Sequence, residues 1–103
     1  MDRISQIKEY LKTEPEDNFL QHALALEYIK AGNDAEAKIL FKKILEREPG
    51  YVGSYYHLGK LLERIGETQN EIHIYKKGME MAKSANDTHA FNELQAACED
   101  LED

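Results

Sequence analysis

The stretch 31–37, AGNDAEA, places a glycine and an asparagine between two runs of strong helix formers. The run before it contains FLQHALALEYIK, and the run after it contains EAKILFKKILERE. Gly32 can adopt the left-handed conformation that ends a helix cheaply, and Asn33 or Asp34 can then cap the next helix. The stretch therefore predicts a tight turn between the two helices of a hairpin.

Apolar residues recur at helical spacing in six segments, and the alternation that is typical of a strand is not found over any useful length. In the first segment Ile4, Ile7 and Leu11 share one helix face. The six segments contain DRISQIKEYLK, DNFLQHALALEYIK, EAKILFKKILER, SYYHLGKLLERI, EIHIYKKGMEMA and HAFNELQAACEDL. The sequence thus predicts an all-α fold of about six helices.

Further residues that end or cap helices mark the other predicted turns. Gly66 ends a helix as Gly32 does, and Thr68 with Glu71 forms the T-x-x-E pattern of a capping box for the helix that follows. Asp87 is the expected cap of the last helix. These positions predict helical hairpins whose partners run antiparallel.

The turn residues and several helix residues repeat along the chain at one constant offset, the one that separates Gly32 from Gly66. The matched positions are Gly32 and Gly66, Pro15 and Pro49, Leu24 and Leu58, Lys42-Lys43 and Lys76-Lys77, and Glu46 and Glu80. The N-terminal segment joins the pattern, with matches of Lys8 to Lys42, Leu11 to Leu45 and Glu14 to Glu48. A unit of two helices that recurs with this offset resembles the tetratricopeptide repeat family, whose period is the same.

The resemblance extends to the family's signature positions. In the first repeat the matching residues are Leu24, Ala25, Tyr28, Ala37, Phe41 and Pro49, whereas Gln21 replaces the opening aromatic residue. In the second repeat Tyr55, Leu58 and Gly59 match, Leu62 replaces the family's tyrosine, and Tyr75 replaces its phenylalanine. Glu71 stands where the family has a small alanine, which predicts a loosened or shifted last hairpin, and Lys83 stands where it has a proline.

The resemblance implies one domain over 1–103, an α-solenoid of antiparallel hairpins in a right-handed superhelix. Its expected parts are a half-repeat helix at 2–14, repeats at 18–51 and 52–85, and a capping helix at 87–102 that covers the last apolar face. In this family the first helix of each repeat lines a concave groove for a peptide or a partner helix. By resemblance the groove residues here are Phe19, His22, Leu26, Ile29, Lys30, Tyr56, Lys60, Glu63 and Arg64.

The resemblance thus implies a non-catalytic scaffold for protein–protein interaction. Lys60 and Arg64 can each donate a charge-assisted hydrogen bond to a partner's carboxylate. The alternative is a structural or self-associating unit, in which the wall of Phe19, Leu26 and Ile29 receives the same wall of a second copy. The polar outer face of the N-terminal helix favours a monomer, but a homodimer stays open.

Composition and spacing argue against other functions. A formal net charge of −7 is unfavourable for binding nucleic acid, the start MDRISQIKEY has no apolar core of a secretory signal, and no window suits a membrane span. Cys98 is alone, and the four histidines lack metal-ligand spacing, so we expect no disulfide, metal or cofactor. No nucleophile–base constellation points to an enzyme, and the expected setting is the reducing cytoplasm.

Overall fold

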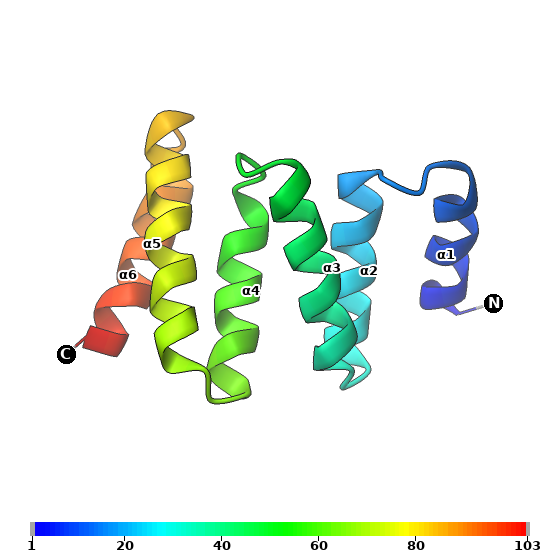
Figure 1. The fold of residues 1–103 in the computed structure, drawn as a ribbon, viewed down its shortest axis with the longest axis horizontal. Coiled ribbons are helices and arrows are strands. Elements are labelled where there is room, and N and C mark those ends of the chain that lie inside the picture. Colours follow the sequence, from blue (N-terminus) through cyan, green and yellow to red (C-terminus); the bar gives the residue numbers. More distant parts are fainter. Residues whose placement is uncertain (1, 103) are drawn as a thin grey trace. The chain divides into compact units, whose positions relative to one another are not determined.

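The computed structural model describes residues 2–102, which form six α-helices and no strand, so the predicted all-α class is confirmed (Figure 1). The helices are α1 (Arg3–Thr13), α2 (Asn18–Lys30), α3 (Asp34–Arg47), α4 (Gly53–Arg64), α5 (Thr68–Ser84) and α6 (Thr88–Glu102).

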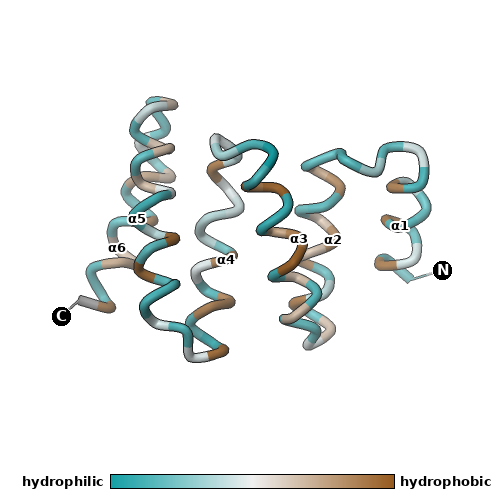
Figure 2. The backbone as a smooth tube through the Cα atoms, in the orientation of Figure 1, coloured by the Kyte–Doolittle hydropathy of each residue, from teal (hydrophilic) through white to brown (hydrophobic). Residues whose placement is uncertain are grey.

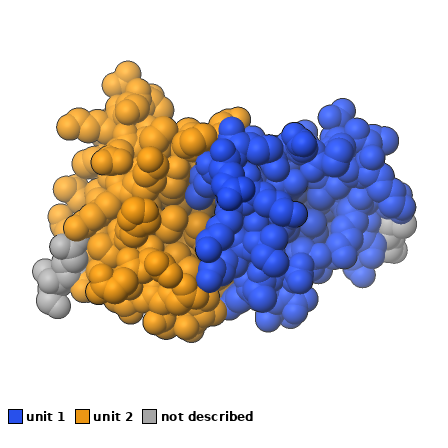
Figure 3. All heavy atoms as spheres, in the orientation of Figure 1, with its two compact units in different colours: residues 1–47 blue, residues 48–103 orange. Residues whose placement is uncertain are grey.

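The chain forms two compact units, residues 1–47 and residues 48–103 (Figure 3). In the first unit α2 packs against both α1 and α3, and in the second unit α5 packs against both α4 and α6. Short turns join these helices as antiparallel neighbours (Figure 1). Hydrophobic positions recur along the helices between hydrophilic ones, as the periodicity of the sequence predicts (Figure 2).

The turns at Gly32 and Gly66 are confirmed, because these residues have φ angles of 82° and 81°. A third turn, between α5 and α6, uses Asn86 at a φ of 58°. Each turn is closed by the same pair of backbone hydrogen bonds, from Gly32 N to Ile29 O and Asn33 N to Tyr28 O, from Gly66 N to Glu63 O and Glu67 N to Leu62 O, and from Asn86 N to Lys83 O and Asp87 N to Ala82 O. One helix-ending motif therefore occurs three times.

The helix starts are partly as predicted. Asp87 caps α6, since its Oδ1 accepts a hydrogen bond from the Ala90 N–H at 3.0 Å. The predicted capping box of α5 is wrong: Thr68 is already helical, Glu67 is the cap residue without a side-chain capping bond, and the Glu71 side chain is buried. The helix starts at Thr68, one residue earlier than the capping box predicts, and Glu71 lies on the packed face.

The core of the first unit is apolar and centres on the α2–α3 hairpin. Its buried apolar residues are Ile7, Leu24, Ala25, Ala37, Phe41 and Ile44. The amide of Gln21 is also buried, and its Nε2 donates to Pro15 O at 2.8 Å while its Oε1 accepts from Arg47 at 2.7 Å. Both ends of this polar group are therefore satisfied.

Gln21 explains how the first repeat manages without its opening aromatic residue. Tyr55 holds the equivalent position of the second repeat, and its hydroxyl donates to Pro49 O at 2.6 Å. The Gln21–Pro15 bond is the same link from a helix to the proline that precedes it. Gln21 therefore makes the hydrogen bond that Tyr55 makes in the second repeat, but it lacks the aromatic ring.

The core of the second unit is closely packed, contrary to the loosened hairpin that Glu71 predicted. Its buried apolar residues are Tyr55, Leu58, Leu61, Leu62, Tyr75, Ala82, Leu94 and Cys98. The ring of Tyr75 lies where a Cβ on Gly59 would be, and a Cβ on Gly78 would lie 2.7 Å from the Cβ of Tyr55. Each helix of the α4–α5 pair therefore places a tyrosine over a glycine of the other, so the two backbones approach closely.

The last hairpin is extended because the second repeat lacks its closing proline. Lys83 holds the position in the second repeat that Pro49 holds in the first, and without proline α5 continues to Ser84. α6 then packs on α5 through Leu94 and Cys98, which are buried. The exposed residues of α6 are polar except Ala96, and include Asn92, Glu93, Gln95, Glu99 and Asp100. This distribution is what a capping helix requires.

We expect Gly32→Ala to lower the free energy of unfolding by about 1 kcal/mol, because alanine is strained at the left-handed φ of that turn. Urea denaturation followed by circular dichroism measures the change. Gly50→Ala is the matched control, since Gly50 is not in the left-handed region and an added Cβ would meet nothing within 4 Å. Equal stability of both variants would contradict the assigned turn geometry.

Candidate functional site

The predicted groove residues of the first unit all lie on α2, and we call them the α2 surface: Phe19, His22, Leu26, Ile29 and Lys30. Phe19 is 71% exposed, which is high for an aromatic side chain. Leu26 and Ile29 are half-buried. A face of this kind offers apolar area to a partner while it stays anchored to its own unit.

Two members of the α2 surface are engaged in packing or pairing. The ring of His22 lies edge-on to Phe41 of α3, with the centroids 5.6 Å apart. Lys30 contacts Glu27 within its own helix, Nζ to Oε2 at 3.2 Å. Of the three apolar members, Phe19 is exposed and Leu26 and Ile29 are half-buried.

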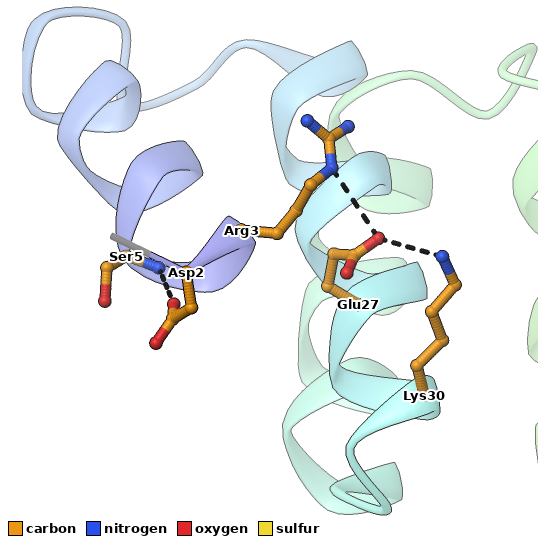
Figure 4. Close-up of polar contacts among 5 residues, drawn as sticks. All are labelled: Asp2, Arg3, Ser5, Glu27 and Lys30. Carbon is orange, nitrogen blue, oxygen red and sulfur yellow. Dashed lines mark hydrogen bonds and ion pairs between the residues drawn. The ribbon is translucent and has the colours of Figure 1, made fainter.

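A polar contact between α1 and α2 adds residues that the sequence did not single out. Oε2 of Glu27 faces both Lys30 and Arg3, whose Nε lies 3.8 Å away (Figure 4). Lys8 of α1 also lies over the ring of Tyr28, 5.7 Å from its centroid. Arg3 and Lys30 are largely solvated although Glu27 is mostly shielded, so we expect these ion pairs to contribute only modestly to stability.

The predicted groove residues of the second unit lie on α4, and we call them the α4 surface: Tyr56, Lys60, Glu63 and Arg64. Lys60 Nζ lies 5.7 Å from the centroid of the Tyr56 ring, a cation–π contact that fixes the ammonium group on the surface. Glu63 and Arg64 are exposed. The α4 surface therefore carries two cations and one carboxylate.

His57 lies beside the α4 surface but adds no charge to it at neutral pH. Burial lowers the pKa of His57, and the charge of Glu93 on α6 raises it by less. Its imidazole is consequently neutral near pH 7, so the positive charge of this face comes from Lys60 and Arg64.

Within residues 2–102, no group of three or more histidine, cysteine, aspartate or glutamate side chains is arranged to hold a metal ion. In the same part of the chain, no helix combines the length and the hydropathy needed to cross a bilayer.

A cavity of about 220 Å³ lies at the α5–α6 turn, and its walls include no residue of the α4 surface. It is lined by Ala82, Lys83, Asn86, Asp87, Thr88 and Phe91. No pattern in the sequence indicates this cavity, because it depends on the extension of α5 beyond the length of the repeat.

Comparison with protein families finds the tetratricopeptide repeat twice in this chain, at residues 20–51 and 52–84. Together the two matches cover more than half of the sequence. A search of curated proteins finds no match.

Solved structures of the same architecture include a crystal structure and a solution structure from one organism. The crystal structure of a tetratricopeptide repeat domain protein from Salinibacter ruber is 42% identical, covers 84% of this chain and 96% of that chain, and has a TM-score of 0.80. A solution structure of a Salinibacter ruber domain is 43% identical over 85% of this chain and 89% of that chain, with a TM-score of 0.82.

A more distant structure shares the fold alone. The TPR2B domain of yeast Sti1, solved as a TPR2B-domain:pHsp70 complex, is 17% identical with a TM-score of 0.88. The match covers 96% of this chain and 79% of that chain.

Proposed function

Because the chain belongs to the tetratricopeptide repeat family, we propose that it is a non-catalytic interaction module that binds a peptide or a partner helix through its α2 and α4 surfaces. The observation that carries the proposal is the α4 surface, where Lys60 is held over Tyr56 one helical turn from Arg64. The proposal includes a cytoplasmic setting and no cofactor.

The charge of the α4 surface indicates what the partner presents. The two cations Lys60 and Arg64 outnumber the one carboxylate, Glu63, so the α4 surface has a net positive charge. The whole chain has a net charge of −7. Two cations spaced four residues apart on a helix suit a carboxylate, either an acidic side chain or a C-terminus. We therefore propose an acidic or C-terminal protein segment as the partner.

The α2 surface offers apolar area to a partner. Phe19 is an exposed aromatic side chain, and Leu26 and Ile29 are half-buried on the same helix face. Aromatic residues that are already held on a rigid helix lose little conformational entropy on binding. The pHsp70 complex of the Sti1 domain supports the proposal only as a case in which this fold holds a partner.

Selection of peptides with free C-termini from a display library tests the proposal. We expect the enriched peptides to carry aspartate or glutamate near the C-terminus and to bind saturably in fluorescence anisotropy titrations. Their affinity should fall as salt rises, because the α4 cations are partly exposed.

Two outcomes would contradict the peptide-binding proposal. Failure to enrich any peptide that binds saturably would do so directly. Sedimentation equilibrium at micromolar concentration that shows a dimer, converted to a monomer by Leu26→Lys, would instead support the self-associating alternative.

A further inference from the structure

Glu71 is a buried carboxyl group in the first turn of α5, at the position where the first repeat has Ala37. Its side chain is 1% exposed, and neither carboxylate oxygen has a hydrogen-bond partner. One turn further along α5 the hydroxyl of Tyr75 is also buried without a partner. Buried polar groups that lack partners are rare, and each calls for a physical explanation.

The groups that face Glu71 come from both helices of the hairpin. α4 contributes Glu63, Lys60 and, next to the Tyr75 hydroxyl, Tyr56, whereas α5 contributes Tyr75. Glu63 and Tyr75 lie close enough to influence the pKa of Glu71, but neither completes a hydrogen bond to it. Burial is the main cause that raises the pKa of Glu71, and Glu63 adds to it, while the Tyr75 hydroxyl and then the charge of Lys60 partly offset both. Burial also raises the pKa of Tyr75 above its usual range, so that its phenol stays neutral.

We propose that Glu71 is a proton-binding switch of the second unit, neutral while α4 and α5 are packed together and loosening that hairpin when it ionises. The geometry supports this role because an ionised carboxylate enclosed here has no hydrogen-bonded donor to replace its lost water. The side chain is only 1% exposed, so bulk water does not reach the carboxylate while the hairpin is closed.

The direction of the pH dependence follows from the two states. In the unfolded chain Glu71 ionises near its ordinary pKa of 4.5, and in the folded chain its pKa is higher. The stability that the neutral carboxyl contributes is therefore fully present below pH 4.5 and is lost as pH rises through the folded-state pKa. His57 works in the opposite direction, because its pKa is lowered, so the contribution of Glu71 must be isolated by substitution.

The test measures melting temperature from pH 4.5 to pH 8 for the natural chain, Glu71→Gln and Glu80→Gln. Glutamine has the shape of the neutral carboxyl and cannot ionise, and Glu80 is an exposed glutamate of the same helix. We expect the natural chain to lose about 4 °C or more relative to Glu71→Gln across this range, whereas Glu80→Gln follows the natural chain. Parallel profiles for the natural chain and Glu71→Gln would overturn the proposal.

Amide hydrogen exchange locates the effect within the chain. After correction for the intrinsic pH dependence of exchange, we expect protection in α4 and α5 to fall as pH rises, with α2 and α3 as the internal reference. Glu71→Ala, which installs the residue of the first repeat, should remove the difference between the units if it folds. An equal loss of protection in both units of the natural chain would overturn the local switch.

Discussion

Gly59→Ala is expected to destabilise the protein by about 1–3 kcal/mol, although alanine is the better helix former. An added Cβ would overlap the ring of Tyr75, which is fully buried and belongs to the facing helix. Relief requires the α4 and α5 backbones to separate, which exposes the core of the second unit. Urea denaturation monitored by circular dichroism measures the loss.

Two variants make this expectation specific. Gly53→Ala, also in α4, places its Cβ where nothing lies within 4 Å, so it should leave stability unchanged or raise it by up to about 1 kcal/mol. Gly59→Ala combined with Tyr75→Leu should cost less than the sum of the two single changes, because leucine leaves room for the new methyl group. Simple additivity of the two would show that the ring does not set the close approach.

We expect charge reversal of both α4 cations, Lys60→Glu with Arg64→Glu, to lower the affinity for an acidic peptide more than tenfold. This corresponds to a loss of more than about 1.4 kcal/mol of binding free energy. Each substitution removes a donor and places a negative charge against the partner's carboxylate. Anisotropy titrations at two salt concentrations measure the affinity, and the salt dependence should diminish in the variant.

The control for this pair changes net charge by the same amount elsewhere in the unit. Lys76→Glu with Lys77→Glu alters two exposed positions of α5, and we expect it to change affinity little. Arg64→Glu alone leaves Lys60 beside Glu71 and should give an intermediate loss with native melting behaviour. Unchanged affinity in the α4 double variant would move the ligand to another surface.

The hairpin turns could be predicted because they depend on residue type. Gly32 and Gly66 both have positive φ angles, and the interval between them is the length of the repeat. The third turn was predicted from its cap, Asp87, but its left-handed residue was not, because Asn86 tolerates that region without requiring it. A motif built on backbone hydrogen bonds is visible in sequence only where glycine supplies it.

The helix register could not be read from capping patterns alone. Thr68 and Glu71 have the spacing of a capping box, but Glu71 also lies four residues before Tyr75 on the packed face of α5. Packing determined the outcome, since Tyr75 and Gly59 fix the rotation of α5 against α4. Sequence spacing allowed Glu71 either to cap α5 or to lie on its packed face. It did not indicate how closely α4 and α5 would pack.

The sequence predicted which residues belong to each candidate surface. Only the structure shows which of these residues already contact other side chains of the chain. The members of both surfaces, Phe19 and Lys60 among them, were implied by the resemblance to the repeat family. That His22 packs on Phe41 and that Lys30 contacts Glu27 depends on rotamers and on neighbouring helices. The assignment of these surfaces to ligand binding stays a prediction.

The most direct test of the proposed function is a map of backbone amide chemical shifts as the tightest selected acidic peptide is added to isotope-labelled protein. We predict that the shifts concentrate in α2 and α4, with Lys60 and Arg64 among the strongest and with α3 and α5 changed little. Shifts that concentrate in α3 and α5, and leave both predicted surfaces unchanged, would contradict it.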